Sequence, residues 1–431
     1  MDRSPAACSR NSLFRSLCIS TVFLVLAPCV RAQGLMEEVR QQPKIRAITA
    51  FINLDRTKYR QQIAETLAFL RSAKEVFRQG GYEVQTIRIT TQPFPQYTQG
   101  MTAEQAVAFF KEYDALAAKE GFDASIGPAM LNEGDTEAQA DLLGEILRQT
   151  KILNGSVAVA GEDGVRWNAV AAAARVIKKL SETSEHSQKS FNFAATAMVP
   201  PFTPFYPASY HTGFGRQFAL ALQSANTVTE VFRNNAEPAA AQRKLTERLA
   251  NFAFAIQALA EKVDAQSGWT YMGIDLSPAP LKDVSIGEAI ENLTSRPFGA
   301  VGTLTAAAAI TAAIKNVGVK QVGYTGLMLP VLEDARLAKR WSEGRITIDA
   351  LLAYSAVCGT GLDTVPLPGD TTLNELTRII GDMASLAVKW HKPLSARLLP
   401  VAGKLSGQQT EFDDPFLVNA TIQPLSGEPK P

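Results

Sequence analysis

The segment that organises the chain spans residues 354–372 and reads YSAVCGTGLDTVPLPGDTT. It holds a thiol, Cys358, and two carboxylates, Asp363 and Asp370, on a backbone rich in Gly and Pro. Apolar residues at helical spacing flank it on both sides, and Thr372 begins a capping-box pattern for the second helix. The segment is too rich in Gly and Pro for a helix and too apolar for an ordinary surface loop. We therefore interpret it as a loop that carries a functional site; a buried turn with a packed Cys and two capping Asp residues is the alternative.

Strand-like and helix-like patterns alternate along the rest of the chain. The predicted strands are 44–54, 82–90, 123–127, 155–160, 191–199, 269–276, 320–325 and 394–401. The predicted helices are 59–79, 102–120, 136–149, 167–180, 218–232, 244–263, 304–314 and 334–343. Long helices between successive strands are typical of parallel sheets, so the pattern predicts one α/β domain over residues 33–431, with a mainly parallel sheet that is open or closed.

Several polar residues lie where predicted strands end. Asp275 lies near the end of one strand, and Lys404 follows the last one. Tyr210 and His211 come after a loop rich in Pro and aromatic residues, which itself follows a strand. Ligands of parallel sheets bind beside the carboxyl ends of the strands. We therefore expect these residues to share a site with the 354–372 loop.

Residues 1–32 have the pattern of a secretory signal peptide. Three arginines form a basic start, an apolar run covers residues 17–26, and residues 30–32 (VRA) fit a signal-peptidase site. We expect cleavage before Gln33 and a secreted or periplasmic protein. The apolar run is too short for a comfortable membrane span, so no stable membrane insertion is expected once the signal is removed. Lipidation at Cys29 is the open alternative to simple cleavage.

The first prediction concerns this processing. The exported protein is expected to begin near Gln33, because signal peptidase cleaves after a small residue such as Ala32. N-terminal sequencing of the protein recovered from its host measures this directly. A cytoplasmic protein that retains Met1 would contradict the prediction.

The charge balance argues against nucleic acid as a partner. The chain has 43 Lys and Arg against 42 Asp and Glu, a formal net charge of +1, and nucleic-acid-binding proteins need a basic surplus. Three of the four cysteines lie within residues 1–32, so Cys358 is the only thiol of the mature chain and no intramolecular disulfide can form. A small molecule is therefore the expected partner, and a homo-oligomer is left open.

The sequence contains no complete dinucleotide-binding, P-loop, nucleophile-elbow or zinc motif. With three histidines and one mature cysteine, a carboxylate site for a divalent cation such as Mg²⁺ or Ca²⁺ is the metal site that the composition allows. The spacing selects no ligand set. The candidate ligands are Asp275, Glu333, Asp334, Asp363, Asp370, Glu411, Asp413 and Asp414.

Five stretches of the chain combine into a family pattern. They are 191–211 (FNFAATAMVPPFTPFYPASYH), 268–280 (GWTYMGIDLSPAP), 323–334 (GYTGLMLPVLED), 354–371 (YSAVCGTGLDTVPLPGDT) and 395–414 (SARLLPVAGKLSGQQTEFDD). Together they resemble the uncharacterised family known as domain of unknown function 711. The resemblance implies the fold of the pyruvate-formate-lyase-like superfamily, a closed ten-stranded, mainly parallel barrel with surrounding helices and a loop inserted in the barrel. It implies no known reaction.

Within that fold, residues 356–369 would be the loop that enters the barrel. The resemblance also suggests Cys358 as a thiol that carries a radical. The glycyl radical enzymes of the superfamily need a glycine in an Arg-Val-x-Gly-like sequence near the C-terminus. Residues 397–403 (RLLPVAG) match that sequence only weakly. Export also argues against the oxygen-free setting that such a radical needs. No glycyl radical is therefore expected.

We expect an enzyme that acts on a small polar or anionic molecule in the barrel interior, by acid/base or nucleophilic chemistry. The residues expected to take part in catalysis are Cys358, His211, Asp275, Asp363 and Asp370. The residues expected to bind the substrate are Arg397, Lys404 and Tyr210. The alternative is a non-catalytic protein that binds a small ligand in the same cavity.

Overall fold

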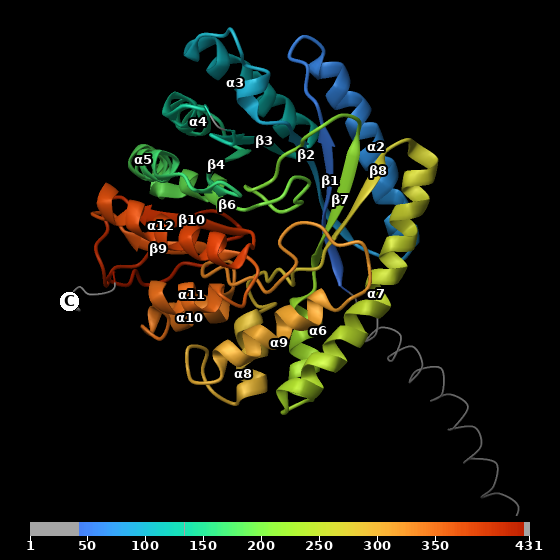
Figure 1. Cartoon of the computed structure of the whole chain (residues 1–431), viewed down its shortest axis with the longest axis vertical. Coiled ribbons are helices and arrows are strands. Elements are labelled where there is room, and N and C mark those ends of the chain that lie inside the picture. The colour runs from blue at the N-terminus through green and yellow to red at the C-terminus, as the bar shows by residue number, and fades with distance from the viewer. Residues whose placement is uncertain (1–42, 133, 426–431) are drawn as a thin grey trace, which may run out of the picture. The chain divides into compact units, whose positions relative to one another are not determined.

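The computed structural model describes residues 43–132 and 134–425, which belong to one compact unit (Figure 1). The predicted signal peptide lies outside the described residues. The first half of the chain supplies five strands that pair in parallel in chain order. They are β1 (Lys44–Ile52), β2 (Val84–Thr91), β3 (Asp123–Ala129), β4 (Leu153–Gly161) and β6 (Phe193–Ala197).

The second half of the chain extends this array at both sides. The strands β7 (Gln217–Gln223) and β8 (Thr270–Asp275) follow β1, while β10 (Leu394–Val401) and β9 (Gly361–Pro368) follow β6. The order is β8-β7-β1-β2-β3-β4-β6-β10-β9, with the short β5 (Gly164–Val165) paired to β4. Only the β1–β7, β6–β10 and β4–β5 pairings are antiparallel. The prediction of an α/β protein with a mainly parallel sheet is therefore confirmed.

Helices cover the outer face of this sheet (Figure 1). They are α2 (Tyr59–Gln79), α3 (Ala103–Glu120), α4 (Glu137–Gln149), α5 (Trp167–Thr183), α6 (Ala225–Arg233), α7 (Pro238–Ser267), α8 (Ile286–Thr294), α9 (Thr303–Lys315), α10 (Ala335–Ser342), α11 (Ile348–Ser355) and α12 (Leu373–Trp390), with 3₁₀ turns at η1 (Phe94–Gln96) and η2 (Glu185–Asn192). Along β1, Ile48, Ala50 and Ile52 belong to the large core beneath the helices, as the period of two in a strand requires. No helix among the described residues is long and apolar enough to cross a membrane.

The segment inserted against the inner face is the Pro/aromatic stretch 200–211. The Thr49 hydroxyl donates to the Pro204 carbonyl oxygen at 3.2 Å, and the Tyr206 hydroxyl donates to the Ile89 carbonyl oxygen at 2.9 Å. These contacts hold the segment on the second halves of β1 and β2. The sequence predicted that 356–369 would be the inserted loop, and the structure assigns that position to 200–211 instead.

The expected loop over 354–372 contains a strand. Residues 361–368 form β9, which pairs in parallel with β10 and has Leu399 opposite Pro366 and Val401 opposite Pro368. A proline cannot donate to a ladder, but an edge strand tolerates it where its other side is unpaired. The Pro content that argued for a loop therefore reflects an edge strand.

Two other predicted elements differ from the structure. The predicted helix 218–232 is strand β7 followed by α6. Its first half alternates Phe218, Leu220 and Leu222 toward the large core, and pairing with β1 overrides the helix propensity of its Ala and Leu residues. The predicted strand 320–325 makes only an isolated bridge between Gln321 and Ile274 of β8.

The edge strands of the sheet are β8 and β9, and no regular ladder joins them in the described part of the chain. The segment between 321 and 330 lies next to both. It bridges β8 at Gln321 and β9 through Pro330, which is opposite Asp363. The sheet is thus a mixed, mostly parallel ten-stranded sheet whose two edges contact the same segment.

Candidate functional site

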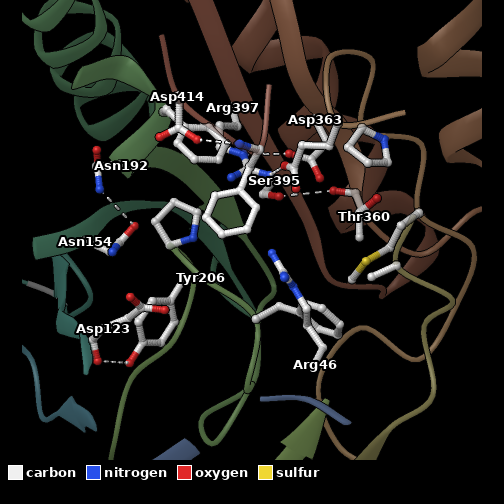
Figure 2. A pocket seen from close by; sticks show the side chains of 18 of the residues that line it. Arg46, Asp123, Asn154, Asn192, Tyr206, Thr360, Asp363, Ser395, Arg397 and Asp414 are labelled. Carbon is white, nitrogen blue, oxygen red and sulfur yellow. Dashed lines mark hydrogen bonds and ion pairs between the residues drawn. The ribbon is translucent and has the colours of Figure 1, made fainter. Parts of the chain in front are cut away.

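A cavity of about 220 Å³ lies on the inner face, at the amino ends of the parallel strands (Figure 2). Arg46 of β1, Asp123 at the start of β3 and Asn154 near the start of β4 line it, and Asn192 directly precedes β6. The sequence pattern predicted a site at the carboxyl ends. The inserted segment 200–211 covers the second halves of β1 and β2, so the open space lies at the opposite end of these strands.

Arg397 is the most strongly paired cation of the cavity. Its Nε donates to Asp363 Oδ1 at 2.7 Å, and its Nη2 donates to Glu333 Oε1. Its guanidinium also lies over the Phe191 ring, 4.7 Å from the ring centre. Burial opposes the charge of Arg397, but the two carboxylates raise its pKa above the usual value. Burial raises the pKa of Glu333, against the attraction of Arg397.

The local sequence explains why these groups meet. On β10, Ser395 and Arg397 face the cavity, while Leu398 belongs to the large core. The single residue Arg397 of β10 lies opposite two residues of β9, Asp363 and Thr364, which makes a bulge that includes Asp363. A bulge redirects a side chain relative to regular alternation. Asp363 thereby faces Arg397, as the sequence analysis expected of two residues in one site.

Arg46 also lies on a bulge, because β1 has one residue more than β7 between Ile45 and Ala47. Its Nη1 donates to Gln85 Oε1 at 3.3 Å, and its guanidinium lies 4.9 Å from the centre of the Phe416 ring. No carboxylate of the described residues lies within ion-pair distance of it. Burial, followed by repulsion from Arg88, lowers the pKa of Arg46 to about 10. Glu333 and Asp123 attract this cation only from farther away, so the cavity contains a cation without a paired carboxylate in the described structure.

Arg88 is a second arginine whose hydrogen bonds are incomplete. Its side chain is buried, its Nη1 donates to the Pro204 carbonyl oxygen at 3.2 Å, and it lies 4.7 Å from the centre of the Tyr206 ring. Its Nε is 3.5 Å from Asp123 Oδ2 and has no hydrogen-bond partner in the described structure. The hydroxyl of Thr360, also buried and lining the cavity, likewise has none.

Asp414 is the carboxylate of the cavity without a paired cation. Its Oδ1 accepts a hydrogen bond from the Phe416 backbone N–H at 2.9 Å. Within the described residues, no Lys or Arg lies within ion-pair distance of it. Burial raises its pKa, although Arg397 and Lys282 act on it from farther away in the opposite sense. Lys151, which is exposed, also lines the cavity.

The other residues that the sequence analysis selected lie outside the cavity lining. Asp275 is fully buried and accepts four hydrogen bonds: from Ser277 N at 3.0 Å, Ser277 Oγ at 2.6 Å, Tyr324 N at 2.8 Å and Thr325 N at 3.1 Å. Burial raises its pKa to about 6. Gly323 has a positive φ of 82°, and a Cβ there would collide with Asp275 Oδ2. Asp275 thus ties β8 to the segment that carries Tyr324, a lining residue.

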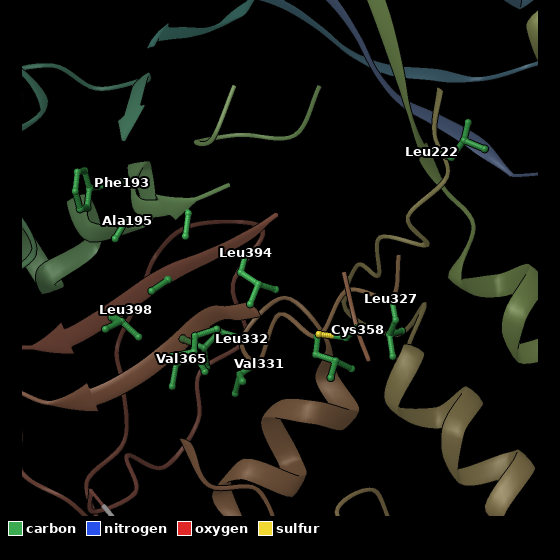
Figure 3. Packing of buried hydrophobic residues seen from close by; sticks show 14 of the residues in the cluster. Phe193, Ala195, Leu222, Leu327, Val331, Leu332, Cys358, Val365, Leu394 and Leu398 are labelled. Atoms are coloured by element: carbon green, nitrogen blue, oxygen red, sulfur yellow. The ribbon is translucent and has the colours of Figure 1, made fainter. Parts of the chain in front are cut away.

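Cys358 lies after α11 in the large hydrophobic core, with 1% of its surface exposed (Figure 3). Its neighbour Gly359 donates its N–H to the Leu327 carbonyl oxygen at 2.7 Å. Lys392 donates to the carbonyl oxygen of Cys358 and, at 2.9 Å, to that of Ser355. The thiol is therefore in the well-buried class of single cysteines rather than at the cavity.

His211 is the buried last residue of the inserted segment. Its Nδ1 lies 3.2 Å from Asn53 Oδ1, its Nε2 lies 2.7 Å from Gln217 Oε1, and its backbone N–H donates to the Thr91 carbonyl oxygen at 3.0 Å. Burial lowers its pKa, so the neutral ring is favoured. The neighbouring Tyr210 donates its hydroxyl to the Val199 carbonyl oxygen at 3.1 Å.

Two further candidates lie nearer solvent. Asp370 is exposed, and its side chain makes no hydrogen bond or ion pair with any described residue. Thr372, not Asp370, caps α12. Lys404 pairs with Glu411 at 2.6 Å. The structure thus brings together Arg397 and Asp363, and the catalytic and substrate-binding roles suggested for all of these residues stay predictions.

The sequence analysis missed the arginines of the two central strands. Arg46 interrupts the apolar run of β1, and Arg88 does the same in β2. A charged residue inside a buried strand pattern needs a partner or a polar cavity, which is the signal that could have found both. Among the described residues, no group of three or more His, Cys, Asp or Glu side chains is arranged to hold a metal ion.

Comparison with known proteins gives the family. A "UPF0210 protein" of Pyrobaculum islandicum is 32% identical over 394 residues, which cover 84% of this chain and 86% of the relative. A "UPF0210 protein" of Desulforudis audaxviator is 30% identical and covers 78% of each chain. The relative from Bifidobacterium longum strain NCC 2705 is 28% identical and covers 85% of each. The family model described as "Uncharacterised ACR (DUF711)" matches residues 38–414, and the chain therefore belongs to the DUF711 family.

Proposed function

We propose that the cavity at the amino ends of the parallel strands binds a small anionic molecule. The observation that carries the proposal is Arg46, a partly buried cation of the cavity that has no carboxylate within ion-pair distance in the described structure. Arg88, whose Nε makes no hydrogen bond in the described structure although Asp123 lies 3.5 Å away, lines the same space. A carboxylate or phosphate group there would accept charge-assisted hydrogen bonds from both guanidinium groups.

The surroundings of Arg46 support this assignment. The protein leaves this cation partly desolvated and repelled by Arg88, whereas it surrounds Arg397 with two carboxylates. A buried charge without a partner costs free energy, which a bound anion would recover. The cavity volume of about 220 Å³ restricts the ligand to a small molecule.

The second prediction tests this site. Arg46→Gln is expected to weaken the binding of small carboxylates or phosphates by about 10- to 100-fold, because charge-assisted hydrogen bonds contribute about 1.5–3 kcal/mol. A thermal-shift screen of small mono- and dicarboxylates and inorganic phosphate finds the binders, and calorimetry measures their affinities. Arg60→Gln, an exposed arginine paired with Glu112 at 2.9 Å, is the matched control. If the Arg46 and Arg60 variants bind equally well, the proposal is wrong.

Catalysis on the bound molecule is the second candidate, and Glu333 favours it. Its pKa is raised by burial and it lines the cavity, which suits a group that exchanges protons with a ligand. The Glu333→Gln variant would then still bind the ligand but would no longer convert it chemically. NMR spectra of the ligand measure this conversion. Binding without any such change in the wild-type protein supports the non-catalytic alternative.

We also propose that the sheet closes into the barrel of the pyruvate-formate-lyase-like superfamily. The bridges of the 321–330 segment to both edge strands support closure. Export, with cleavage before Gln33, belongs to the same proposal and rests on the pattern of residues 1–32. An exported protein would meet its ligand outside the cytoplasm.

A further inference from the structure

We infer that the ligand of this cavity is a zwitterion, a small acid that also carries an ammonium group bound by Asp414. This inference deepens the proposed function and rests on it. The anionic group of the ligand would lie at Arg46 and Arg88, and the ammonium group would lie at Asp414. The ligand class is therefore that of amino acids and other small amino-substituted acids.

First, most of the charged side chains that line the cavity are paired with one another. Arg397 is compensated by Asp363 and Glu333, and Arg88 has Asp123 at 3.5 Å. Two enclosed side chains then have no ion-pair partner within the described structure, the cation Arg46 and the anion Asp414. They are of opposite sign and line one cavity. A ligand with both charges would neutralise both, whereas a simple anion would leave Asp414 uncompensated.

The second step is that the protein keeps these two charges apart. The Phe416 ring lies under the guanidinium of Arg46, 4.9 Å from it. The backbone N–H of the same Phe416 donates to Asp414 Oδ1 at 2.9 Å, which orients the carboxylate. Figure 2 shows Arg46 and Asp414 on opposite sides of the space.

Third, two other cations act on Asp414, but only from a distance. Arg397 and Lys282 lower its pKa from a distance, but Arg397 donates to two other carboxylates and Lys282 is exposed. Neither lies within ion-pair distance of Asp414. A primary ammonium group has three hydrogen-bond donors and would place a positive charge next to Asp414, which these two side chains do not do.

The fourth step is the uncharged lining. The buried hydroxyl of Thr360 has no hydrogen-bond partner among the described residues, and Asn154 and Asn192 add amide groups to the wall. Such groups can accept from an ammonium group and donate to a carboxylate. An apolar ligand would leave the Thr360 hydroxyl unsatisfied, which costs free energy. The lining therefore suits a ligand that is polar at both ends.

The third prediction tests this with two sets of compounds that differ only in their charged groups. The first set is alanine, propionate and ethylamine, and the second is 4-aminobutyrate, butyrate and propylamine, so that short and long charge separations are both sampled. In at least one set the amino acid is expected to bind about tenfold more tightly than its deaminated acid. Calorimetry on the purified protein measures the three affinities of each set.

Two variants separate the roles of the charges. Asp414→Asn keeps an oxygen that can accept from the Phe416 N–H, and it is expected to erase the advantage of the amino acid while binding of the plain acid remains. Arg46→Gln is expected to weaken acid and amino acid alike. Asp413→Asn changes the neighbouring carboxylate, which is 76% exposed in its side chain and lies 3.4 Å from His186, and serves as the matched control.

The outcomes distinguish the two proposals. If the acids bind through Arg46 but the amino acids gain nothing, or keep their gain in Asp414→Asn, the zwitterion inference is overturned and the anion site stands. If no compound of either set binds to the wild-type protein, the zwitterion inference is overturned; if the carboxylates and phosphate of the thermal-shift screen also fail to bind, the anion site is overturned as well. The melting temperatures of the Asp414→Asn and Asp413→Asn variants are compared with each other. If they agree, any loss of binding is not caused by a loss of folding.

Discussion

Replacing Arg397 by Met is expected to lower the free energy of unfolding by about 3–5 kcal/mol at neutral pH, because it leaves two buried carboxylates without their cation. Asp363 and Glu333 each accept from Arg397, and these two side chains are only 13% and 12% exposed. Urea unfolding followed by circular dichroism measures the change. The matched control is Arg175→Met, whose arginine also faces two carboxylates but is 37% exposed. An exposed pair contributes about 0–1 kcal/mol, so this variant is expected to change little.

The pH dependence of the Arg397→Met variant has a definite sign. Without the arginine, burial and repulsion from Asp363 hold the folded-state pKa of Glu333 above that of the unfolded chain. The folded state then binds more protons than the unfolded state over that range, so stability increases as the pH falls through the raised pKa of Glu333. The difference in the free energy of unfolding between the variant and the wild-type protein is therefore expected to become smaller on mild acidification. A variant that is as stable as the wild-type protein at neutral pH would show that the pairing contributes nothing.

Replacing Asp275 by Ala is expected to cost about 3–5 kcal/mol, since buried donors left without an acceptor cost about 1–3 kcal/mol each and water can satisfy part of them. The donors are Ser277, Tyr324 and Thr325, which together give four hydrogen bonds to this carboxylate. Loss of these bonds would loosen the 323–326 segment, and with it Tyr324 in the cavity wall. Urea unfolding and thermal melting measure the effect.

Asp370→Ala is the control for this prediction, because the sequence analysis selected both aspartates for the same site. Asp370 is exposed, and its side chain has no partner among the described residues. Its removal is expected to change stability by less than about 0.5 kcal/mol. A stable Asp275→Ala variant that had lost its chemistry would instead support the catalytic role predicted from the sequence.

Most of the helices and the mainly parallel character of the sheet could be predicted because local patterns decide them. The predicted helix 59–79 and the predicted strand 394–401 agree with the structure at both ends. In two of the misassigned segments, a partner strand overrides local preference. Residues 217–223 pair with β1 despite their Ala and Leu content, and 361–368 pair with β10 despite two prolines.

The candidate site could be predicted only in part. Arg397 and Asp363 were found because one lies in a strong strand and the other in an unusual Gly/Pro-rich segment. Arg46 and Asp414 were not recognised as lining one cavity. Arg46 faces it through a bulge in β1, and no local pattern shows where a strand will have an extra residue opposite its partner.

The sequence alone determined the α/β class, the mainly parallel sheet and the membership of the family, since apolar periodicity and long motifs are properties of the chain itself. Only the tertiary structure decided which end of the strands is open. Packing of 200–211 on the second halves of β1 and β2 covers the end where a ligand was expected. It also decided which charges are paired, because Coulomb interactions depend on distances between side chains far apart in sequence, as for Arg397 with Glu333 and Asp363. Among the described residues, that same three-dimensional pairing leaves the enclosed side chains of Arg46 and Asp414 in the cavity without an ion-pair partner.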